Sequence, residues 1–263
     1  MKLIKNLKDF ALRYFPKQTH LMTNKWYYSY VLKRETLSVK PDLKIISKLI
    51  KKGDVVLDIG ANYGTFTKFL SESVSKNGKV YCIEPIPKTF KILQHCIKKL
   101  KLTNSIPLNY AVSDKNGVVT MQIPKWKQKG LIQGQPNPYR ARIMNKKNRK
   151  DDLQTIHVKS RSIDSLFKDI KNISFIKMDV ECHELPSLKG GKKTLEKSKP
   201  NCIIEVVNDK AFKFMEKLGY NSYWFDIRYN KLRKTKKGVK GIPDYLFVHP
   251  TNPLQKLIPS FLE

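Results

Sequence analysis

The sequence predicts a doubly wound α/β fold whose mostly parallel sheet ends in an antiparallel hairpin. The first observation is an apolar run at 55–59 that leads through a turn with Gly60 and Gly64 into a helix, the arrangement found where buried parallel strands meet helices. The second is an alternation of strand-like apolar runs with segments of helical spacing from Pro41 onward. The length of 263 residues suits one such domain with extensions.

The predicted elements follow the order that this fold requires. Residues 41–250 form the expected domain, between an N-terminal basic and aromatic extension, 1–40, and a C-terminal tail, 251–263. Prolines, glycines and basic residues at 124–152 interrupt the alternation and predict an insertion loop. We expect helices at 42–50, after Gly64, at 90–100, near 163–170 and at 212–218, strands at 55–59, 80–83, 108–112, 118–123, 155–158, 175–180 and 202–207, and a hairpin of 223–227 with 245–248 across a basic loop.

The N-terminal extension begins with a basic amphipathic helix. Residues 3–15 place apolar side chains on one helical face, while Lys2, Lys5, Lys8 and Arg13 fall elsewhere. Such a helix either packs on its own domain, which is the commoner outcome, or contacts an anionic membrane surface peripherally. The oligomeric state is not readable from the sequence.

The composition predicts a cytoplasmic protein with an anionic partner. There is no apolar run long enough to cross a bilayer and no apolar core of a signal peptide. Cys82, Cys96, Cys182 and Cys202 lack C-x-x-C spacing and are expected to be reduced thiols. The formal charge of +30, from 52 Lys and Arg against 22 Asp and Glu, favours a nucleic acid, an anionic lipid surface or an acidic glycan as partner. Lysine enrichment by an AT-rich genome explains the charge equally well.

The glycine turn predicts an adenosine-binding site. A dinucleotide turn needs G-x-G-x-x-G, but Asn62 and Thr65 occupy the second and third glycine positions. The remaining pattern, D-x-G-x-x-x-G from Asp58 to Gly64, resembles motif I of class I S-adenosylmethionine-dependent methyltransferases. About twenty residues further on, the strand 80–83 ends in Glu84, where an acidic residue binds ribose hydroxyls. We expect Asp58, Gly60, Asn62, Gly64, Glu84 and Asp114 to bind the cofactor; a turn-stabilising carboxylate is the alternative role for Asp58.

Several later segments narrow the resemblance to one family. F-I-K-M-D-V-E-C-H-E-L-P-S-L-K-G-G at 175–191 and I-I-E-V at 203–206 resemble the FkbM family of methyltransferases, as do A-V-S-D-K-N-G at 111–117 and R-S-I-D-S-L at 161–166. The resemblance covers about residues 41–250. It implies a Rossmann-like class I methyltransferase fold with a seven-stranded sheet, and transfer of a methyl group to oxygen, commonly on sugars or natural products. Cys182 stands where the family usually has glycine.

The catalytic candidates lie at the end of the strand 175–180. Ligands of open α/β sheets bind beyond the carboxyl ends of the strands, so Asp179, Glu181 and His183 are candidates for removing the proton of an acceptor hydroxyl. Capping of the helix that starts near Glu184 is the alternative for the carboxylates, and a surface position for the histidine. Glu205, at the end of the next strand, is expected to contact substrate. Together the four side chains also suggest a site for a divalent metal such as Mg²⁺.

The leading functional hypothesis is an O-methyltransferase that acts on a hydroxyl of a glycan, a glycolipid or a related metabolite. Arg140 and Arg142 in the basic loop are expected to hold an anionic part of that acceptor. RNA 2′-O-methylation is the alternative, with Trp126 and Tyr139 stacking on bases. A non-catalytic basic binding platform is a third hypothesis, which the retained glycines and carboxylates disfavour.

Overall fold

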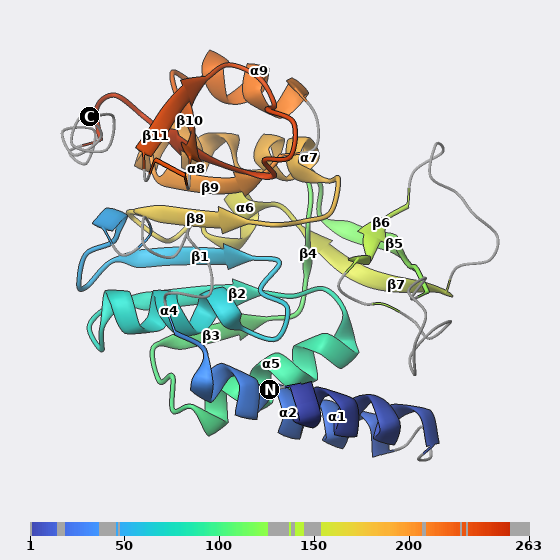
Figure 1. The fold of residues 1–263 in the computed structure, drawn as a ribbon. Helices are drawn as coiled ribbons and strands as arrows, with labels where there is room; N and C mark the ends of the chain where they lie inside the picture. Colours follow the sequence, from blue (N-terminus) through green and yellow to red (C-terminus); the bar gives the residue numbers. More distant parts are fainter. Residues whose placement is uncertain are drawn as a thin grey trace.

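The computed structural model describes residues 2–14, 19–36, 46, 48–125, 137, 140–144, 154–206, 209–226, 228–229 and 231–252. The predicted helix at 42–50 and the insertion loop at 124–152 fall largely outside these residues, as do Trp126 and Tyr139 and nearly all of the tail. Within them the chain forms two sheets flanked by helices (Figure 1). The predicted α/β class is confirmed.

The main sheet has eight strands in the described part of the chain, in the order β11-β10-β12-β9-β8-β1-β2-β3. The five strands from β9 to β3 in this order run parallel to one another. Strand β12 pairs antiparallel with β9, and β10 pairs antiparallel with β12, as the predicted hairpin requires. The strands are β1 (Val55–Ile59), β2 (Lys79–Ile83), β3 (Ser105–Leu108), β8 (Phe175–Met178), β9 (Asn201–Glu205), β10 (Asn221–Asp226), β11 (Lys231–Thr235) and β12 (Asp244–Val248).

Strand β11 is the difference from the predicted seven strands, because it lies inside the segment expected to be a basic loop. Leu232 is buried, and the carboxylate of Asp226 accepts hydrogen bonds from the side chains of Arg228 and Arg233. These contacts tie β11 to β10 as an edge strand. Charged side chains are common on edge strands, which is why a pattern with one apolar residue did not suggest a strand.

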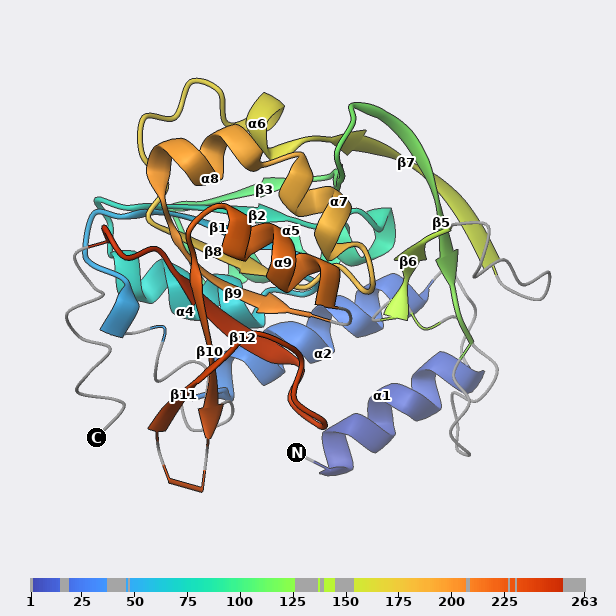
Figure 2. The same cartoon turned by 90° about the horizontal axis from the view of Figure 1, so that it is seen from above.

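A second, smaller sheet lies beyond the carboxyl ends of the parallel strands (Figures 1 and 2). The prediction of one strand at 108–112 is wrong, because the chain leaves the main sheet at Asn109. The side-chain amide of Asn109 donates hydrogen bonds to the backbone carbonyls of Glu84 at 2.7 Å and Pro85 at 3.1 Å. Leu108 therefore ends β3, and Ala111 begins a strand of the other sheet. The order is β4-β7-β5-β6, with β4 (Ala111–Val112), β5 (Gly117–Ile123), β6 (Arg142–Ile143) and β7 (Gln154–Arg161).

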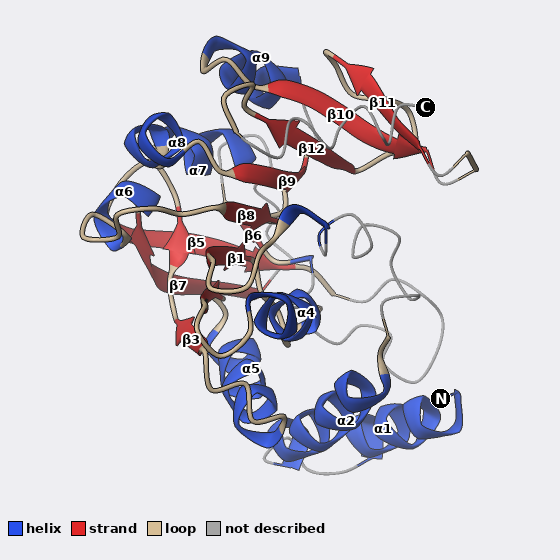
Figure 3. Ribbon diagram, turned by 90° about the vertical axis from the view of Figure 1, so that its left-hand side faces the viewer, coloured by secondary structure: helices blue, strands red, loops and turns tan. Residues whose placement is uncertain are grey.

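Helices cover both faces of the main sheet (Figure 3). Strand alternation explains the two apolar cores: Leu57 and Ile59 of β1 pack with α7, α8 and α9, whereas Val56 packs with α4. N-terminal to the domain, α2 packs on α5, where Leu32 is fully buried. The helices are α1 (Lys2–Tyr14), α2 (His20–Arg34), α4 (Thr65–Val74), α5 (Pro87–Lys99), α6 (Ile163–Leu166), α7 (Glu184–Lys189), α8 (Lys192–Ser198) and α9 (Asp209–Lys217).

Candidate active site

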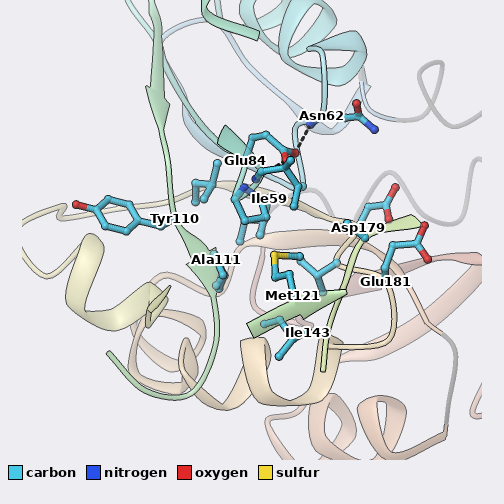
Figure 4. A pocket seen from close by; sticks show the side chains of 16 residues that line it. Ile59, Asn62, Glu84, Tyr110, Ala111, Met121, Ile143, Asp179 and Glu181 are labelled. Carbon is cyan, nitrogen blue, oxygen red and sulfur yellow. Dashed lines mark hydrogen bonds between the residues drawn. The ribbon is translucent and has the colours of Figure 1, made fainter. Parts of the chain in front are cut away.

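A cavity opens where β1 and β2 end, with the second sheet as its opposite wall (Figure 4). It contains about 590 Å³ of space, counting the solvent-filled space at its open mouth. One end carries backbone of the glycine turn and the Glu84 carboxylate. The other end is apolar and is lined by Ile86, Tyr110, Met121, Ala141 and Ile143.

The glycine turn at the end of β1 has the geometry that its sequence predicts. Gly60 has φ +83°, and a Cβ atom there would lie 1.8 Å from the carbonyl oxygen of Asp179, so no other residue fits. Gly64 has φ +105° and precedes the first residue of α4. The close approach of Gly60 to Asp179 joins the ends of β1 and β8 into one floor beside the cavity.

Glu84 is the acidic group in the wall of the cavity. Its side chain is buried and accepts hydrogen bonds from the backbone N–H groups of Asn62 at 3.0 Å and Ile86 at 2.9 Å. Burial raises the pKa of Glu84 to about 7, and the nearby carboxylates of Asp179 and Asp58 contribute. Glu84 therefore changes its charge near neutral pH.

Three of the six predicted cofactor residues, Gly60, Asn62 and Glu84, line the cavity, and Asp58, Gly64 and Asp114 do not. Asp58 is 1% exposed and accepts a hydrogen bond of 2.5 Å from the Thr67 hydroxyl, because strand alternation turns it toward α4. Asp114 is exposed and accepts a hydrogen bond from the neighbouring Ser113 hydroxyl.

Asp179 and Glu181 lie at one rim of the cavity (Figure 4). The backbone beyond Asp179 turns sharply: Glu181 has φ +48° and Cys182 has φ +71°. This is the left-handed region, so the chain keeps a glycine-like conformation at the position where the family usually has glycine. Burial and the Asp179 carboxylate raise the pKa of Glu181, against the opposing effect of Arg140 and Arg142.

Asp179 belongs to a cluster of charged groups at the carboxyl end of β8. Its carboxyl group is hydrogen-bonded to that of Glu205 on β9, which requires a proton on one of the two. Burial, together with Asp179, raises the pKa of Glu205 to about 8. Asp179 and Glu205 thus lie at the same sheet edge, but Glu205, unlike Asp179, does not line the cavity.

A buried lysine lies below this carboxyl pair. Lys177 is 2% exposed, and its Nζ lies 3.3 Å from the Asp244 carboxylate and 4.9 Å from the centre of the Phe66 ring. Burial alone lowers the pKa of a lysine, but the carboxylates of Asp244, Asp179 and Glu205 raise the pKa of Lys177 above its ordinary value. Its positive charge therefore offsets part of the negative charge of the cluster.

His183 lies apart from the cavity lining. Its Nε2 is 2.9 Å from the Ser113 hydroxyl, and burial lowers the pKa of its imidazole. Among the described residues there is no group of three or more His, Cys, Asp or Glu side chains arranged to hold a metal ion, so the expected convergence of His183 with Asp179, Glu181 and Glu205 is not observed.

Arg140 and Arg142 lie close to Glu181. Arg142, on β6, is half-buried, and its Nε has no hydrogen-bond partner in the described part of the chain. Arg140 is exposed. Neither residue lines the cavity itself, so both guanidinium groups are placed at the acidic rim and not at the Glu84 end.

The sequence pattern missed Lys177 and the apolar end of the cavity. The signal for Lys177 was present in the sequence, because a lysine between the apolar residues of the buried strand F-I-K-M requires a buried partner. No comparable signal marked Tyr110 or Met121, which reach the cavity only because the chain crosses from the main sheet to the second one.

A parallel sheet with this glycine turn, and an acidic side chain at the end of the next strand, places the chain among the α/β proteins that bind adenosine-containing cofactors at the carboxyl ends of their strands. Residues 58–223 match the family model described as the methyltransferase FkbM domain. The chain therefore belongs to the FkbM family of S-adenosylmethionine-dependent methyltransferases, as the sequence resemblance predicted.

Two relatives are similar over most of the domain. The 2-O-methyltransferase NoeI of Sinorhizobium fredii is 27% identical over 184 residues, which cover 64% of this chain and 70% of the relative. The hexuronic acid methyltransferase AglP of Haloferax volcanii is 26% identical over 166 residues, or 62% and 60% of the two chains. A solved structure of the methyltransferase FkbM from Methylobacillus flagellatus is 14% identical, with 94% of this chain and 60% of that chain covered and a TM-score of 0.46.

Proposed function

We propose that S-adenosylmethionine binds in the cavity with its ribose hydroxyls on Glu84 and its adenine at the apolar end. The fit rests on the chemistry of the two ends, since a carboxylate accepts hydrogen bonds from paired hydroxyls and the apolar side chains suit a purine. Gly60 supports the fit, because it lines the cavity and lets the turn lie directly against the Asp179 backbone. Gly60, Asn62 and Glu84 are the proposed cofactor contacts.

We further propose that the reaction is methylation of an acceptor hydroxyl, with Asp179 as the group that receives its proton. The observation that carries this proposal is the position of Asp179, which lies at the cavity rim and is hydrogen-bonded to Glu205. When bound, the cofactor supplies a methyl group on a positively charged sulfur. The chain's own contribution is to orient the acceptor hydroxyl and to accept its proton, which typically accelerates a reaction by about 10²- to 10⁴-fold.

In this proposal Glu205 and Lys177 are positioning residues. Glu205 holds the Asp179 carboxyl group through the shared hydrogen bond, and Lys177 keeps the cluster from accumulating uncompensated negative charge. Glu181 faces the same rim and is the proposed second contact for the acceptor. His183 is left with a structural role on Ser113.

The proposed acceptor is a glycan or a related metabolite that carries an acidic group. Arg140 and Arg142 at the rim supply guanidinium groups, which bind carboxylates in a bidentate manner. The names of the two relatives support this proposal, because the 2-O-methyltransferase transfers a methyl group to oxygen and the hexuronic acid methyltransferase acts on an acidic sugar. The carboxylate of such an acceptor is the proposed partner of these guanidinium groups.

Release of S-adenosylhomocysteine from candidate acceptors tests the proposal. We expect turnover on uronic-acid-containing glycans, less on their neutral counterparts, and loss of turnover in the Asp179→Asn variant with cofactor binding intact. If the protein methylates RNA but no glycan, and the activity falls steeply with salt, the acceptor is a nucleic acid and not a glycan. A chain that binds no S-adenosylmethionine in calorimetry would be a binding platform without this activity.

A further inference from the structure

The first helix presents four large apolar side chains to solvent, whereas the charged Lys8 and Asp9 are buried against the protein together with Leu12. Leu3, Leu7, Phe10 and Tyr14 on α1 are 71%, 55%, 49% and 61% exposed. Their spacing of four, three and four residues places them in one stripe along a helix about 20 Å long. This outer stripe of α1 is the reverse of the usual arrangement, in which the apolar face covers the core.

The opposite face of α1 is occupied by charged groups that pack on α2. Lys8 and Asp9 are 7% and 6% exposed, and Asp9 forms ion pairs with Lys5 at 3.1 Å and Lys8 at 3.2 Å. The Lys8 ammonium lies 4.5 Å from the centre of the Tyr27 ring on α2. These contacts fix which face of α1 points outward, so the exposure of the apolar stripe is set by the packing of the helix on α2.

The sequence that contains the stripe is strongly basic. Residues 1–34 contain eight Lys and Arg, and Asp9 is the only acidic residue among them. Asp9 is itself neutralised by Lys5 and Lys8. Arg13 is exposed, and its guanidinium carbon lies 5.8 Å from the centre of the Tyr14 ring in the stripe. Exposed apolar side chains in a basic segment match the two components of an anionic membrane surface, the acyl boundary and the lipid headgroups.

We propose that α1 docks the protein on an anionic membrane surface, lying flat with Leu3, Leu7, Phe10 and Tyr14 inserted between the headgroups. In the described part of the chain there is no helix long and apolar enough to cross a membrane, so α1 is a surface anchor and not a span. Docking through α1 does not depend on the acceptor or on the reaction at the cavity.

Vesicle sedimentation with the full chain tests the docking. We expect the protein to bind vesicles made of equal parts phosphatidylcholine and phosphatidylglycerol, to bind vesicles of phosphatidylcholine alone much more weakly, and to be released by salt. Replacing Leu7→Glu and Phe10→Glu together should lower the partition coefficient by about 100-fold or more, because two inserted apolar side chains are lost.

The matched control is Val118→Glu with Tyr229→Glu. Val118 on β5 is 67% exposed, and Tyr229, which follows β10, is 59% exposed. The two substitutions change the net charge by the same amount as the test pair. This variant should keep most of the vesicle binding, and both variants should retain cofactor binding as evidence of folding. Equal recovery with and without anionic vesicles overturns the proposal. So does a concentration-dependent dimer that Leu7→Glu and Phe10→Glu abolish without any vesicle binding, since a second copy then covers the stripe.

Discussion

The pH dependence of cofactor binding is the most direct chemical consequence of the Glu84 environment. In the free protein the pKa of Glu84 is about 7 because its carboxyl group is buried. Two ribose hydroxyls that donate to this group stabilise its charged form and lower the pKa in the complex. The complex then holds fewer protons than the free protein, so affinity must rise with pH.

The size of the effect follows from the position of this pKa. If the pKa in the complex lies well below 6, the association constant for S-adenosylhomocysteine should rise about tenfold between about pH 6 and pH 8, and level off above that range. At pH 7 binding should release about half a proton per ligand, since Glu84 is then half protonated in the free protein.

Calorimetry in two buffers of different ionisation enthalpy measures both the affinity and the proton release. The Glu84→Gln variant should lose the pH dependence and also bind more weakly, because the amide places a donor against the N–H of Asn62 or Ile86, at a cost of about 1–3 kcal/mol. The Glu205→Gln variant should keep the dependence. Equal affinity at both ends of the pH range, with no proton released, would refute the assigned role of Glu84.

Four further predictions concern the floor and rim of the cavity. Asp179→Asn should lower kcat by about 10²- to 10⁴-fold with an unchanged Kd for S-adenosylhomocysteine, and full activity would exclude Asp179 as the base. Gly60→Ala should lower the free energy of unfolding in urea by about 2–5 kcal/mol, since its Cβ meets the Asp179 carbonyl; an unchanged urea midpoint contradicts the close approach. Cys182→Gly should raise that free energy by about 1 kcal/mol by relieving a positive φ, and a loss of stability would argue against strain there. The pKa of Glu205 is raised from 4.5 to about 8 in the folded state. Its protonated carboxyl group therefore stabilises the fold fully below pH 4.5, and this stabilisation is lost as the pH rises to 8. Urea titrations of the Glu205→Gln variant should lack this loss, and a dependence of stability on pH like that of the unmodified protein would count against the carboxyl pair.

The parallel half of the sheet was predictable because its strands are short apolar runs between turn residues. Val55–Ile59 and the glycine turn fixed the place of the cavity, and the acidic residue after β2 fixed its polar end. The strand break at Asn109 was not predictable, because it depends on amide hydrogen bonds to Glu84 and Pro85, 25 and 24 residues away in the chain.

The roles of individual site residues were less predictable than their positions. Strand alternation alone places Asp58 on the opposite face from Ile59, so its distance from the cavity could have been inferred from the sequence. The ion pair of Lys177 with Asp244 could not, since it joins residues 67 positions apart through the order of β8, β9 and β12. The outward apolar face of α1 likewise depends on how Lys8 and Asp9 pack, which periodicity does not reveal.

A crystal structure with S-adenosylhomocysteine would decide whether Glu84 binds the ribose of the cofactor. We expect both ribose hydroxyls within hydrogen-bonding distance of Glu84, adenine beside Met121 and Ile143, and the sulfur directed toward Asp179. A ligand bound elsewhere, or a Glu84 carboxylate that still contacts only the backbone of Asn62 and Ile86, would contradict this expectation.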